Sequence, residues 1–190
     1  MINIRNLERI DEFTTELNRV WKTYFSDWNF YELFSKLFQS NEKNFVSPMT
    51  GKVVAMSDIP DPAFAQKMMG DGCGIELTDG TVVAPFDAKV TAAFPTGHAF
   101  GLEAKEDGTE VLIHIGIDTV EMEGEGFSSN IKVGDEVKQG DVLVVVDLEA
   151  VQEAGKSLVS PIAFTGNNKV EVFKIGQNVV AGEKGLLNYK

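Results

Sequence analysis

The sequence predicts an all-β domain, an antiparallel β-sandwich or barrel-like fold with one short helix, preceded by an amphipathic α-helical extension. The prediction rests on a change of composition near residue 45. All 18 glycines and all 6 prolines follow Val46, whereas 9 of the 18 aromatic residues lie between Phe13 and Phe38. Glycine and proline mark the turns between short strands. We therefore place a helical extension and linker at residues 1–44 and a β domain at residues 45–190.

The extension carries apolar residues at steps of three and four, which is the spacing of one helical face. They are Leu7, Ile10, Phe13, Leu17, Val20, Tyr24, Trp28, Tyr31, Phe34 and Phe38. Ser26-Asp27 offers an N-cap, so we expect two amphipathic helices, or one with a break, before a polar linker from Gln39 to Asn44. With 6 basic and 7 acidic residues and no basic face, any membrane association is expected to be indirect or weak. We expect the apolar face to dock on the β domain, on a second copy or on another protein.

Residues 45–190 contain short stretches rich in Val and Ile that are separated by turn dipeptides, which is typical of antiparallel strands. The dipeptides are Asp79-Gly80, Asp107-Gly108, Gly134-Asp135 and Gly140-Asp141. One short helix is expected at Leu148 to Ala154, with Asp147 as N-cap and Gly155 just past its end.

The chain is strongly acidic, with 17 basic and 29 acidic residues and a net charge of −12. Nucleic acids and anionic lipids are bound through Lys and Arg, so no nucleic-acid partner is expected and a basic protein partner fits better. The single cysteine, Cys73, can form neither an internal disulfide nor a cysteine-rich zinc site. Since no apolar run approaches the length of about 20 residues that spans a bilayer, and no leader pattern is present, we expect a cytoplasmic protein.

Two histidines, His98 and His114, flank the turn dipeptide Asp107-Gly108. A hairpin centred on that turn pairs residues whose numbers sum to about 215, which makes the two imidazoles close neighbours on adjacent strands. The odd positions of the second strand are aliphatic, namely Val111, Ile113, Ile115 and Ile117. His114 occupies an even position and is therefore expected on the face opposite the core.

His98 is harder to place, because Phe100 and Leu102 share its side of the strand. This pattern favours a buried, hydrogen-bonded histidine, unless a bulge at Gly101 reorients the side chain. For His114 the alternative is a solvated surface histidine. The residues alone leave both questions open.

The stretch around His114 is similar to a known signature. Residues 108–120, Gly-Thr-Glu-Val-Leu-Ile-His-Ile-Gly-Ile-Asp-Thr-Val, followed by Glu-Met-Glu-Gly-Glu-Gly-Phe, resemble the phosphorylation-site segment of the glucose-type enzyme IIA of the bacterial phosphoenolpyruvate-dependent sugar phosphotransferase system. Residues 94–99, Phe-Pro-Thr-Gly-His-Ala, resemble the family's second histidine segment. The resemblance runs from about residue 45 to the C-terminus through Ser47–Val53, Ile59–Lys67, Met69–Gly72, Val83–Pro85, Val133–Asp135 and Asp147-Leu148.

This resemblance implies an antiparallel β-sandwich with both histidines in a shallow depression. It implies that His114 accepts a phosphoryl group on Nε2 from phospho-HPr and passes it to a sugar-specific enzyme IIB. In the same way it implies that His98 supports the transfer and that Thr96 is hydrogen-bonded to His98. Asp61 and Asp118 are implied to meet a basic residue of HPr, and no cofactor is implied. The implied apolar rim comprises Phe64, Met68, Phe94 and Leu112.

These residue types suit phosphoryl transfer. A neutral histidine is nucleophilic near pH 7, and its phosphoramidate keeps a high transfer potential. The transition state needs in-line positioning and charge stabilisation, for which His98 offers a hydrogen bond. Thr96 is placed to fix the tautomer of His98, with an ordinary strand threonine as the alternative. Gly116 lies on the His114 side of the strand, where it leaves room for a partner, with a bulge glycine as the alternative.

Three other functions compete with phosphoryl transfer. Two histidines supply only two zinc ligands, so a zinc-dependent hydrolase is disfavoured, and a metal is expected only if a partner completes a site with His98 and His114 in trans. The stretch from Ile131 to Leu143 resembles the rhythm of biotinyl and lipoyl carriers, but Lys138 lacks the context for attachment. A regulatory or interaction module of the same fold, acting on a transporter or a metabolic enzyme, stays open.

Overall fold

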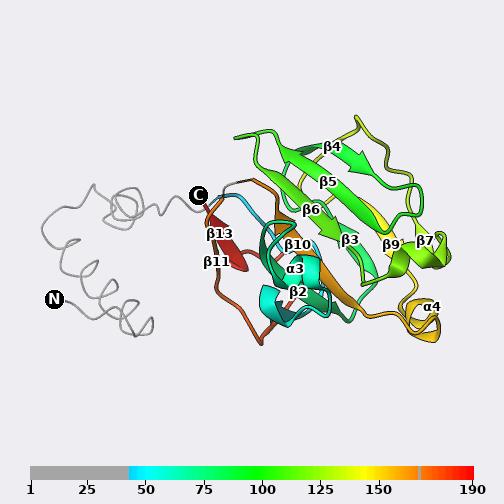
Figure 1. The fold of residues 1–190 in the computed structure, drawn as a ribbon. Coiled ribbons are helices and arrows are strands. Elements are labelled where there is room, and N and C mark those ends of the chain that lie inside the picture. The colour runs from blue at the N-terminus through cyan, green and yellow to red at the C-terminus, as the bar shows by residue number, and fades with distance from the viewer. Residues whose placement is uncertain (1–42, 167) are drawn as a thin grey trace, which may run out of the picture. The chain divides into compact units, whose positions relative to one another are not determined.

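The computed structural model describes residues 43–166 and 168–190, and these residues are mostly β structure (Figure 1). Strands pair antiparallel throughout the described residues, and the helices there are few and short. The predicted antiparallel β class is thereby confirmed. The amphipathic helices expected within residues 1–42 lie outside the described residues.

The largest sheet has eight strands. In spatial order they are β12 (Asn178–Val179), β1 (Gly51–Ala55), β2 (Asp71–Leu77), β10 (Val159–Phe164), β6 (Glu110–His114), β5 (Ala99–Ala104), β4 (Ala88–Ala93) and β8 (Glu136–Val137). Strands that are distant in sequence are neighbours here, since Ile162 of β10 lies opposite both Cys73 of β2 and Ile113 of β6. Strand β6, which ends at His114, is therefore held by hydrogen bonds on both sides.

Four short helical segments are present among the described residues. They are the 3-10 helices η1 (Met56–Asp58) and η2 (Thr119–Met122) and the α-helices α3 (Pro62–Ala65) and α4 (Leu148–Glu153). The prediction for α4 is confirmed, because the Asp147 carboxylate accepts the N–H groups of Glu149 and Ala150, and Gly155 follows the end with a φ of 70°. No helix in residues 43–166 or 168–190 has the length and apolar composition that crossing a bilayer requires.

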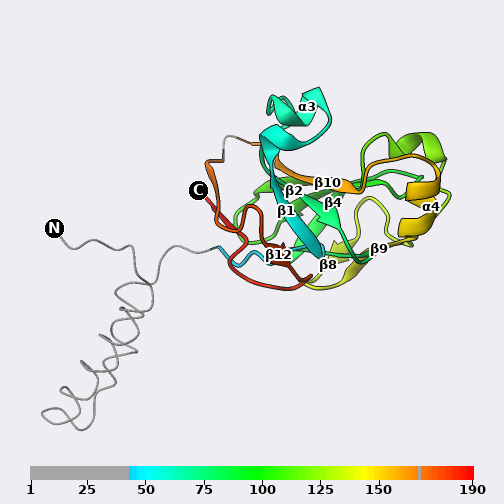
Figure 2. The ribbon, with the colours of Figure 1, turned by 90° about the horizontal axis from the view of Figure 1, so that it is seen from below.

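Two smaller sheets accompany the large one. The first contains β3 (Thr81–Val83), β9 (Val142–Val146) and β7 (Phe127–Ser128), and the second pairs β11 (Val170–Val172) with β13 (Leu187–Tyr189). In Figure 2, β9 lies on one side of β2 and β10, and α3 lies on the other. The main core combines buried side chains of the large sheet, such as Phe100 and Ile113, with those of the three-stranded sheet, such as Val82 and Leu143.

A second, smaller apolar cluster covers the opposite face of the large sheet. It consists of Met56, Ile59, Phe64, Ile117 and Ala163. Burial of this cluster holds the η1–α3 segment against β2 and β10, because apolar area removed from water stabilises the contact. This arrangement brings the first turn of α3 next to the end of β6.

Only one of the four turn dipeptides joins two strands that pair with each other. Asp107-Gly108 connects β5 and β6, which are neighbours in the large sheet. Gly140-Asp141, by contrast, connects β8 and β9, which belong to different sheets. The dipeptides therefore mark turns, but three of them are crossovers rather than hairpins.

The beginning of the described chain packs into the β domain. Lys43 Nζ lies 2.8 Å from the Asp107 carboxylate in the β5–β6 turn. Phe45 is buried, and its ring centroid is 6.3 Å from that of Tyr189. Lys43 and Phe45, on either side of the boundary predicted at Asn44, both contact the β domain.

Candidate functional site

The structure brings the two histidines together, with ring centroids 5.1 Å apart and ring planes 70° apart. His114 ends β6, and His98 immediately precedes β5. Ala99 lies opposite His114, so the numbers of paired residues sum to 213 rather than to the 215 predicted. The predicted proximity of the imidazoles is confirmed. The predicted pairing of β5 with β6 is wrong, because the observed sum is two lower than the predicted one.

The difference in register arises at the hairpin turn. The N–H of Ala104 donates to Thr109 O at 2.8 Å, so the loop between them has four residues. Gly108 is the last of these four and adopts a φ of 73°. The sequence prediction placed Asp107-Gly108 at the centre of a two-residue loop. In longer hairpin loops, however, glycine is also common at the last position, where the backbone is left-handed, and Gly108 occupies such a position.

His98 reaches His114 because the backbone before β5 is not extended. Gly97 has a φ of 71°, and its N–H donates to Phe94 O at 2.8 Å, which closes a tight turn. His98 O accepts the N–H of Ile115, so these two residues lie opposite each other. If the strand alternated regularly up to His98, its side chain would point to the core face, as that of Ile115 does. The turn at Gly97, and not a bulge at Gly101, therefore aims the imidazole.

His98 is both buried and hydrogen-bonded. Its side chain is 5% exposed, and Thr96 Oγ1 lies 2.5 Å from its Nδ1. The contact predicted for Thr96 is present. When the hydroxyl donates to Nδ1, the proton of a neutral His98 resides on Nε2.

His114 is half-buried on the face of β6 opposite the main core. The parity prediction is confirmed, since Val111, Ile113 and Ile115 are completely buried on the other face. Nδ1 of His114 lies 2.8 Å from Gly116 O. A carbonyl can only accept, so Nδ1 carries the proton and the lone pair of the neutral ring is on Nε2.

Gly116 has a different role from the open surface that the sequence predicted. It is buried and has a φ of 68°. A Cβ at this position would lie 2.6 Å from Ser157 O and 2.6 Å from Thr119 Cγ2. Glycine is required by a left-handed turn packed against β10, and its carbonyl orients His114.

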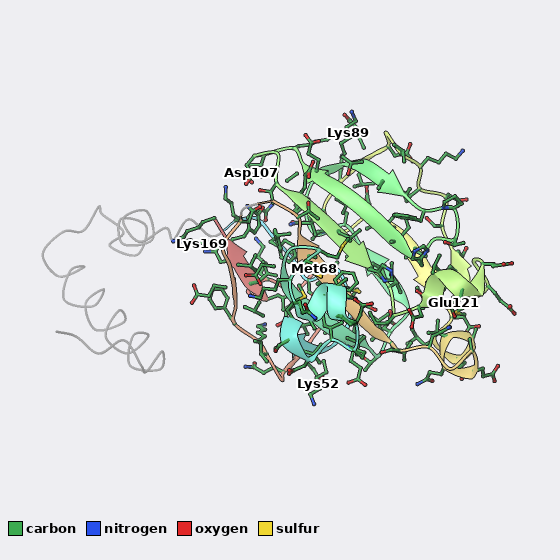
Figure 3. The ribbon with its side chains drawn as sticks, viewed as in Figure 1. Lys52, Met68, Lys89, Asp107, Glu121 and Lys169 are labelled. Carbon is green, nitrogen blue, oxygen red and sulfur yellow. The ribbon has the colours of Figure 1, made fainter. Side chains whose placement is uncertain are left out.

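The residues predicted for the apolar rim differ in burial, and two of them, Phe64 and Phe94, contact the imidazoles. Phe64 is only 6% exposed and packs edge-on against His114, with ring centroids 5.6 Å apart. Phe94 is 47% exposed, and its ring centroid is 5.1 Å from that of His98. Met68 is 74% exposed and projects beside α3 in Figure 3. Leu112 is half-buried and packs on the small cluster.

Two aspartates place negative charge near His114. Asp61 is half-buried, and its Oδ1 accepts the N–H of Ala63 at 2.8 Å and that of Phe64 at 3.2 Å, so it caps α3. Asp118 is exposed at the start of η2 in a left-handed conformation, with a φ of 59°. Asp118 is therefore open to solvent beside His114, whereas the Asp61 carboxylate is also needed to cap α3.

Both histidines are shifted toward the neutral form. Burial lowers the pKa of His98, and the neighbouring His114 lowers it further. Burial also lowers the pKa of His114, and it outweighs the hydrogen bond to Gly116 and the charges of Asp61 and Asp118, which raise that pKa. The site thus places an imidazole whose neutral form has its lone pair on Nε2 beside a second imidazole that can donate a hydrogen bond.

Sequence reasoning missed two hydroxyl residues behind His114. Ser160 Oγ accepts the N–H of Gly116 at 2.9 Å, and Thr119 Oγ1 donates to Ile115 O at 2.5 Å. Both side chains are completely buried. Ser160 is 44 residues from Gly116 in sequence, and only the pairing of β10 with β6 brings them together.

The described residues contain no group of three or more His, Cys, Asp or Glu side chains arranged to bind a metal ion. Cys73 is buried in β2, where burial raises the pKa of its thiol to about 12. The thiol is therefore not a nucleophile at neutral pH.

Comparison with known proteins identifies related chains. Residues 43–170 match the family described as phosphoenolpyruvate-dependent sugar phosphotransferase system, EIIA 1. The PTS system glucose-specific EIIA component of Bacillus cereus is 45% identical over 153 residues, which cover 78% of this chain and 92% of that protein. The component of the same name from Staphylococcus epidermidis is 46% identical over 163 residues, which cover 82% of this chain and 98% of that protein.

A solved structure agrees with these matches. Glucose permease IIA from Mycoplasma capricolum is similar with a TM-score of 0.71 and 37% sequence identity. The match covers 80% of this chain and 97% of that chain. The similarity therefore includes both the sequence and the fold.

Proposed function

Because the chain belongs to the EIIA 1 family of the phosphoenolpyruvate-dependent sugar phosphotransferase system and is a phosphocarrier of that system, we propose that His114 is its phosphoryl acceptor. The observation that carries this proposal is the hydrogen bond between His114 Nδ1 and Gly116 O. It leaves Nε2 with the lone pair that attacks phosphorus. Within the described residues no hydrogen bond occupies Nε2.

The transfer step exchanges one N–P bond for another. The lone pair of His114 Nε2 forms a bond to phosphorus while the N–P bond of a phosphohistidine on HPr breaks, and the HPr imidazole keeps that electron pair. The proton on His114 Nδ1 stays in place, bonded to Gly116 O. In the onward step a thiolate of a sugar-specific enzyme IIB attacks the phosphorus, and Nε2 leaves with its lone pair restored.

His98 is proposed to stabilise the transferring group. Thr96 Oγ1 next to Nδ1 of His98 supports a tautomer whose proton is on Nε2. That N–H can donate to an equatorial phosphoryl oxygen, where negative charge develops. The apolar surroundings supplied by Phe64 and Phe94 limit access of water, which protects the phosphoramidate from hydrolysis.

The proposed partners are HPr as donor and a sugar-specific enzyme IIB as acceptor, which places the exchange in the cytoplasm. Phe94, whose exposed ring lies against His98, and the exposed Met68 that follows α3 are apolar side chains that suit a short-range protein contact. The carboxylates of Asp61 and Asp118 supply negative charge for a basic residue of HPr. Glucose is the sugar we propose, since the relatives from Bacillus cereus and Staphylococcus epidermidis are glucose-specific components.

Intact mass after incubation with phosphoenolpyruvate, enzyme I and HPr tests the acceptor. We expect one added phosphoryl group that is labile in acid and stable in alkali, as a phosphoramidate is, and we expect His114→Ala to abolish it. His98→Gln should still accept the group, because the nucleophile remains, but should pass it to enzyme IIB more slowly by about 10²-fold, as after loss of an oxyanion donor. A phosphorylated His114→Ala protein ends the assignment of His114, and unimpaired onward transfer by His98→Gln removes His98 from the mechanism.

A further inference from the structure

The two peptide groups that meet at Gly116 are hydrogen-bonded at both of their ends. In the Ile115–Gly116 peptide, the carbonyl of Ile115 accepts from Thr119 Oγ1 at 2.5 Å, and the N–H of Gly116 donates to Ser160 Oγ at 2.9 Å. In the Gly116–Ile117 peptide, the carbonyl of Gly116 accepts from His114 Nδ1 at 2.8 Å. The N–H of Ile117 donates to Ser157 O at 3.2 Å. The orientation of the carbonyl that His114 uses is thus fixed by its whole surroundings.

The two hydroxyl groups have no freedom to bind elsewhere. Ser160 Oγ donates its own proton to Leu158 O at 3.0 Å, so a lone pair is directed at the Gly116 N–H. Thr119 uses its proton on Ile115 O. Both side chains are completely buried, and a buried hydroxyl is costly unless it is hydrogen-bonded. Two buried hydroxyls from different segments therefore converge on a single peptide group.

Gly116 depends on this support because glycine has no side chain to restrict its backbone torsions. With a φ of 68° it occupies the left-handed region, from which glycine can leave without a steric barrier from a side chain. If the Ile115–Gly116 peptide were not held, the φ torsion of Gly116 could change, and the following Gly116–Ile117 peptide, which contains the Gly116 carbonyl, would turn away from His114 Nδ1. The imidazole would then take either tautomer, and in one of them the proton is on Nε2, where no attack on phosphorus is possible.

We propose that Ser160 and Thr119 are positioning residues for His114, which fix the Ile115–Gly116 peptide so that the Gly116 carbonyl holds the imidazole proton on Nδ1 and keeps the lone pair on Nε2. This inference rests on the proposed role of His114 as acceptor. Neither residue touches the phosphoryl group, and both act through the backbone of Gly116. Their contribution is to keep the reactive tautomer populated before a partner arrives.

The tautomer of His114 can be measured directly by ¹⁵N NMR of the imidazole in the unphosphorylated full-length protein. We expect a single Nδ1–H tautomer in the natural protein and a mixture in Ser160→Ala and in Thr119→Val, which remove one hydroxyl each. The rate of phosphoryl acceptance at saturating phospho-HPr should fall by about fivefold in each, which is the effect of losing one neutral hydrogen bond. The concentration of phospho-HPr giving half the maximal rate should not change, because the surface that meets HPr is intact.

Ser157→Ala is the matched control. Ser157 lies in the same segment as Ser160, and its Oγ accepts the N–H of Val159 at 3.2 Å, but its side chain does not bond either peptide of Gly116. This variant should keep a single tautomer and the natural rate. Thr119→Ser keeps the hydroxyl and should restore both, which separates positioning from the packing of the methyl group.

The inference is overturned if Ser160→Ala and Thr119→Val keep a single Nδ1–H tautomer, or if Ser157→Ala disturbs the tautomer as much as they do. Failure of the proposed function looks different. If His114→Ala still gains a phosphoryl group, then His114 is not the acceptor, whatever the tautomer measurement shows. Because the NMR readout needs no phosphoryl donor, the two results are independent.

Discussion

One carbonyl oxygen determines which nitrogen of the neutral His114 ring carries the lone pair. Gly116 O binds Nδ1, and burial lowers the pKa of the ring, so the neutral form with a lone pair on Nε2 is the resting state at pH 7. Asp61 and Asp118 oppose this effect of burial, since their charges raise the pKa of His114. If the two aspartates bind a basic residue of HPr, as we propose, their charges at the same time favour protonation of His114.

The lowered pKa of His114 predicts the pH dependence of phosphoryl acceptance. Protonation of Nε2 removes the nucleophile, and a pKa below the ordinary 6.5 means that more than half of the rings are still neutral at that pH. The acceptance rate at saturating phospho-HPr should therefore keep more than half of its maximum at pH 6.5 and decline only below it. An NMR titration of His114 should show the same midpoint, and a midpoint above 6.5 would contradict the prediction.

Removing the nearby carboxylates should lower the pKa of His114 further. In the double variant Asp61→Asn with Asp118→Asn, burial and the Gly116 hydrogen bond remain, but the two charges that favour protonation are gone. The midpoint of the His114 titration should shift to lower pH relative to the natural protein. An unchanged or raised midpoint would show that neither charge reaches the imidazole.

The sequence pointed to the residues that we propose as reactive, but not to the residues that support them. His98, Thr96 and His114 stand out because imidazoles are scarce in this chain and the segments around them resemble a known signature. Ser160 gives no such signal, since an isolated serine in an apolar strand is common and its partner Gly116 is 44 residues away. Contacts between separate strands depend on the sheet order, which the sequence did not predict.

At the scale of elements, α3 carries the Phe64 ring that packs against His114, and Asp61 caps this helix. Asp61 caps α3 through the N–H groups of Ala63 and Phe64, and Phe64 in turn packs against His114. The helix has only four residues, so it depends on this cap and on the small apolar cluster beneath it. The cap therefore influences the position of the Phe64 ring beside His114.

Asp61→Ala and Asp61→Asn should separate the two tasks of this residue. Alanine removes both the cap and the charge and should cost about 1 kcal/mol of local stability, whereas asparagine is an equally good cap and removes only the charge. Hydrogen exchange at the amides of Ala63 and Phe64 should be faster by about fivefold in Asp61→Ala. Equal acceleration in Asp61→Asn would show that the charge, and not the cap, holds α3.

Alternation along β6 and the caps of α4 were predictable, because both follow from local periodicity and local hydrogen bonding. The burial of Val111, Ile113 and Ile115 and the cap at Asp147 agree with the prediction. The register of β5 with β6 was not predictable in the same way, because it depends on whether Gly108 stands in the middle or at the end of the loop. Likewise, the left-handed backbone at Gly97 sets the direction of the His98 side chain, and the alternation of residues along β5 does not predict that direction.

At the scale of the whole molecule, we expect residues 43–190 to fold and accept phosphate without residues 1–42. The first described residues belong to the β domain, since Lys43 pairs with Asp107 and Phe45 is buried against Tyr189. A variant that begins at Lys43 should therefore accept the phosphoryl group at close to the full-length rate. If this variant is unfolded by circular dichroism, the aromatic residues before Lys43 are part of the core.

Phe45→Ala in the same shortened protein provides the contrasting case. Loss of a buried aromatic ring should lower the free energy of unfolding by about 3–5 kcal/mol, measured by urea denaturation. A much smaller loss would mean that the contacts of Phe45 with the core contribute little.

The charge of the β domain predicts how salt affects the reaction. Residues 45–190 contain 11 basic and 22 acidic residues, a net charge of −11, so a basic HPr surface should be steered toward this field. Salt should slow transfer by lowering the association rate, because the Debye length falls to about 3 Å at 1 M. In stopped-flow measurements, saturating phospho-HPr should largely restore the rate, and a rate indifferent to salt at low HPr would rule out steering.

The two ends of the described β domain lie side by side, far from the histidines. The main-chain nitrogen of Lys43 is 3.4 Å from Asn188 Oδ1, two residues before Lys190. Figure 3 shows Asp107, the partner of Lys43, on the opposite side of the domain from Glu121 in η2. A short peptide joining these ends would close the backbone into a ring without passing over the two histidines. The domain is therefore suited to circular permutation, with new termini at an exposed turn such as Gly134-Asp135, and to insertion into a surface loop of another polypeptide.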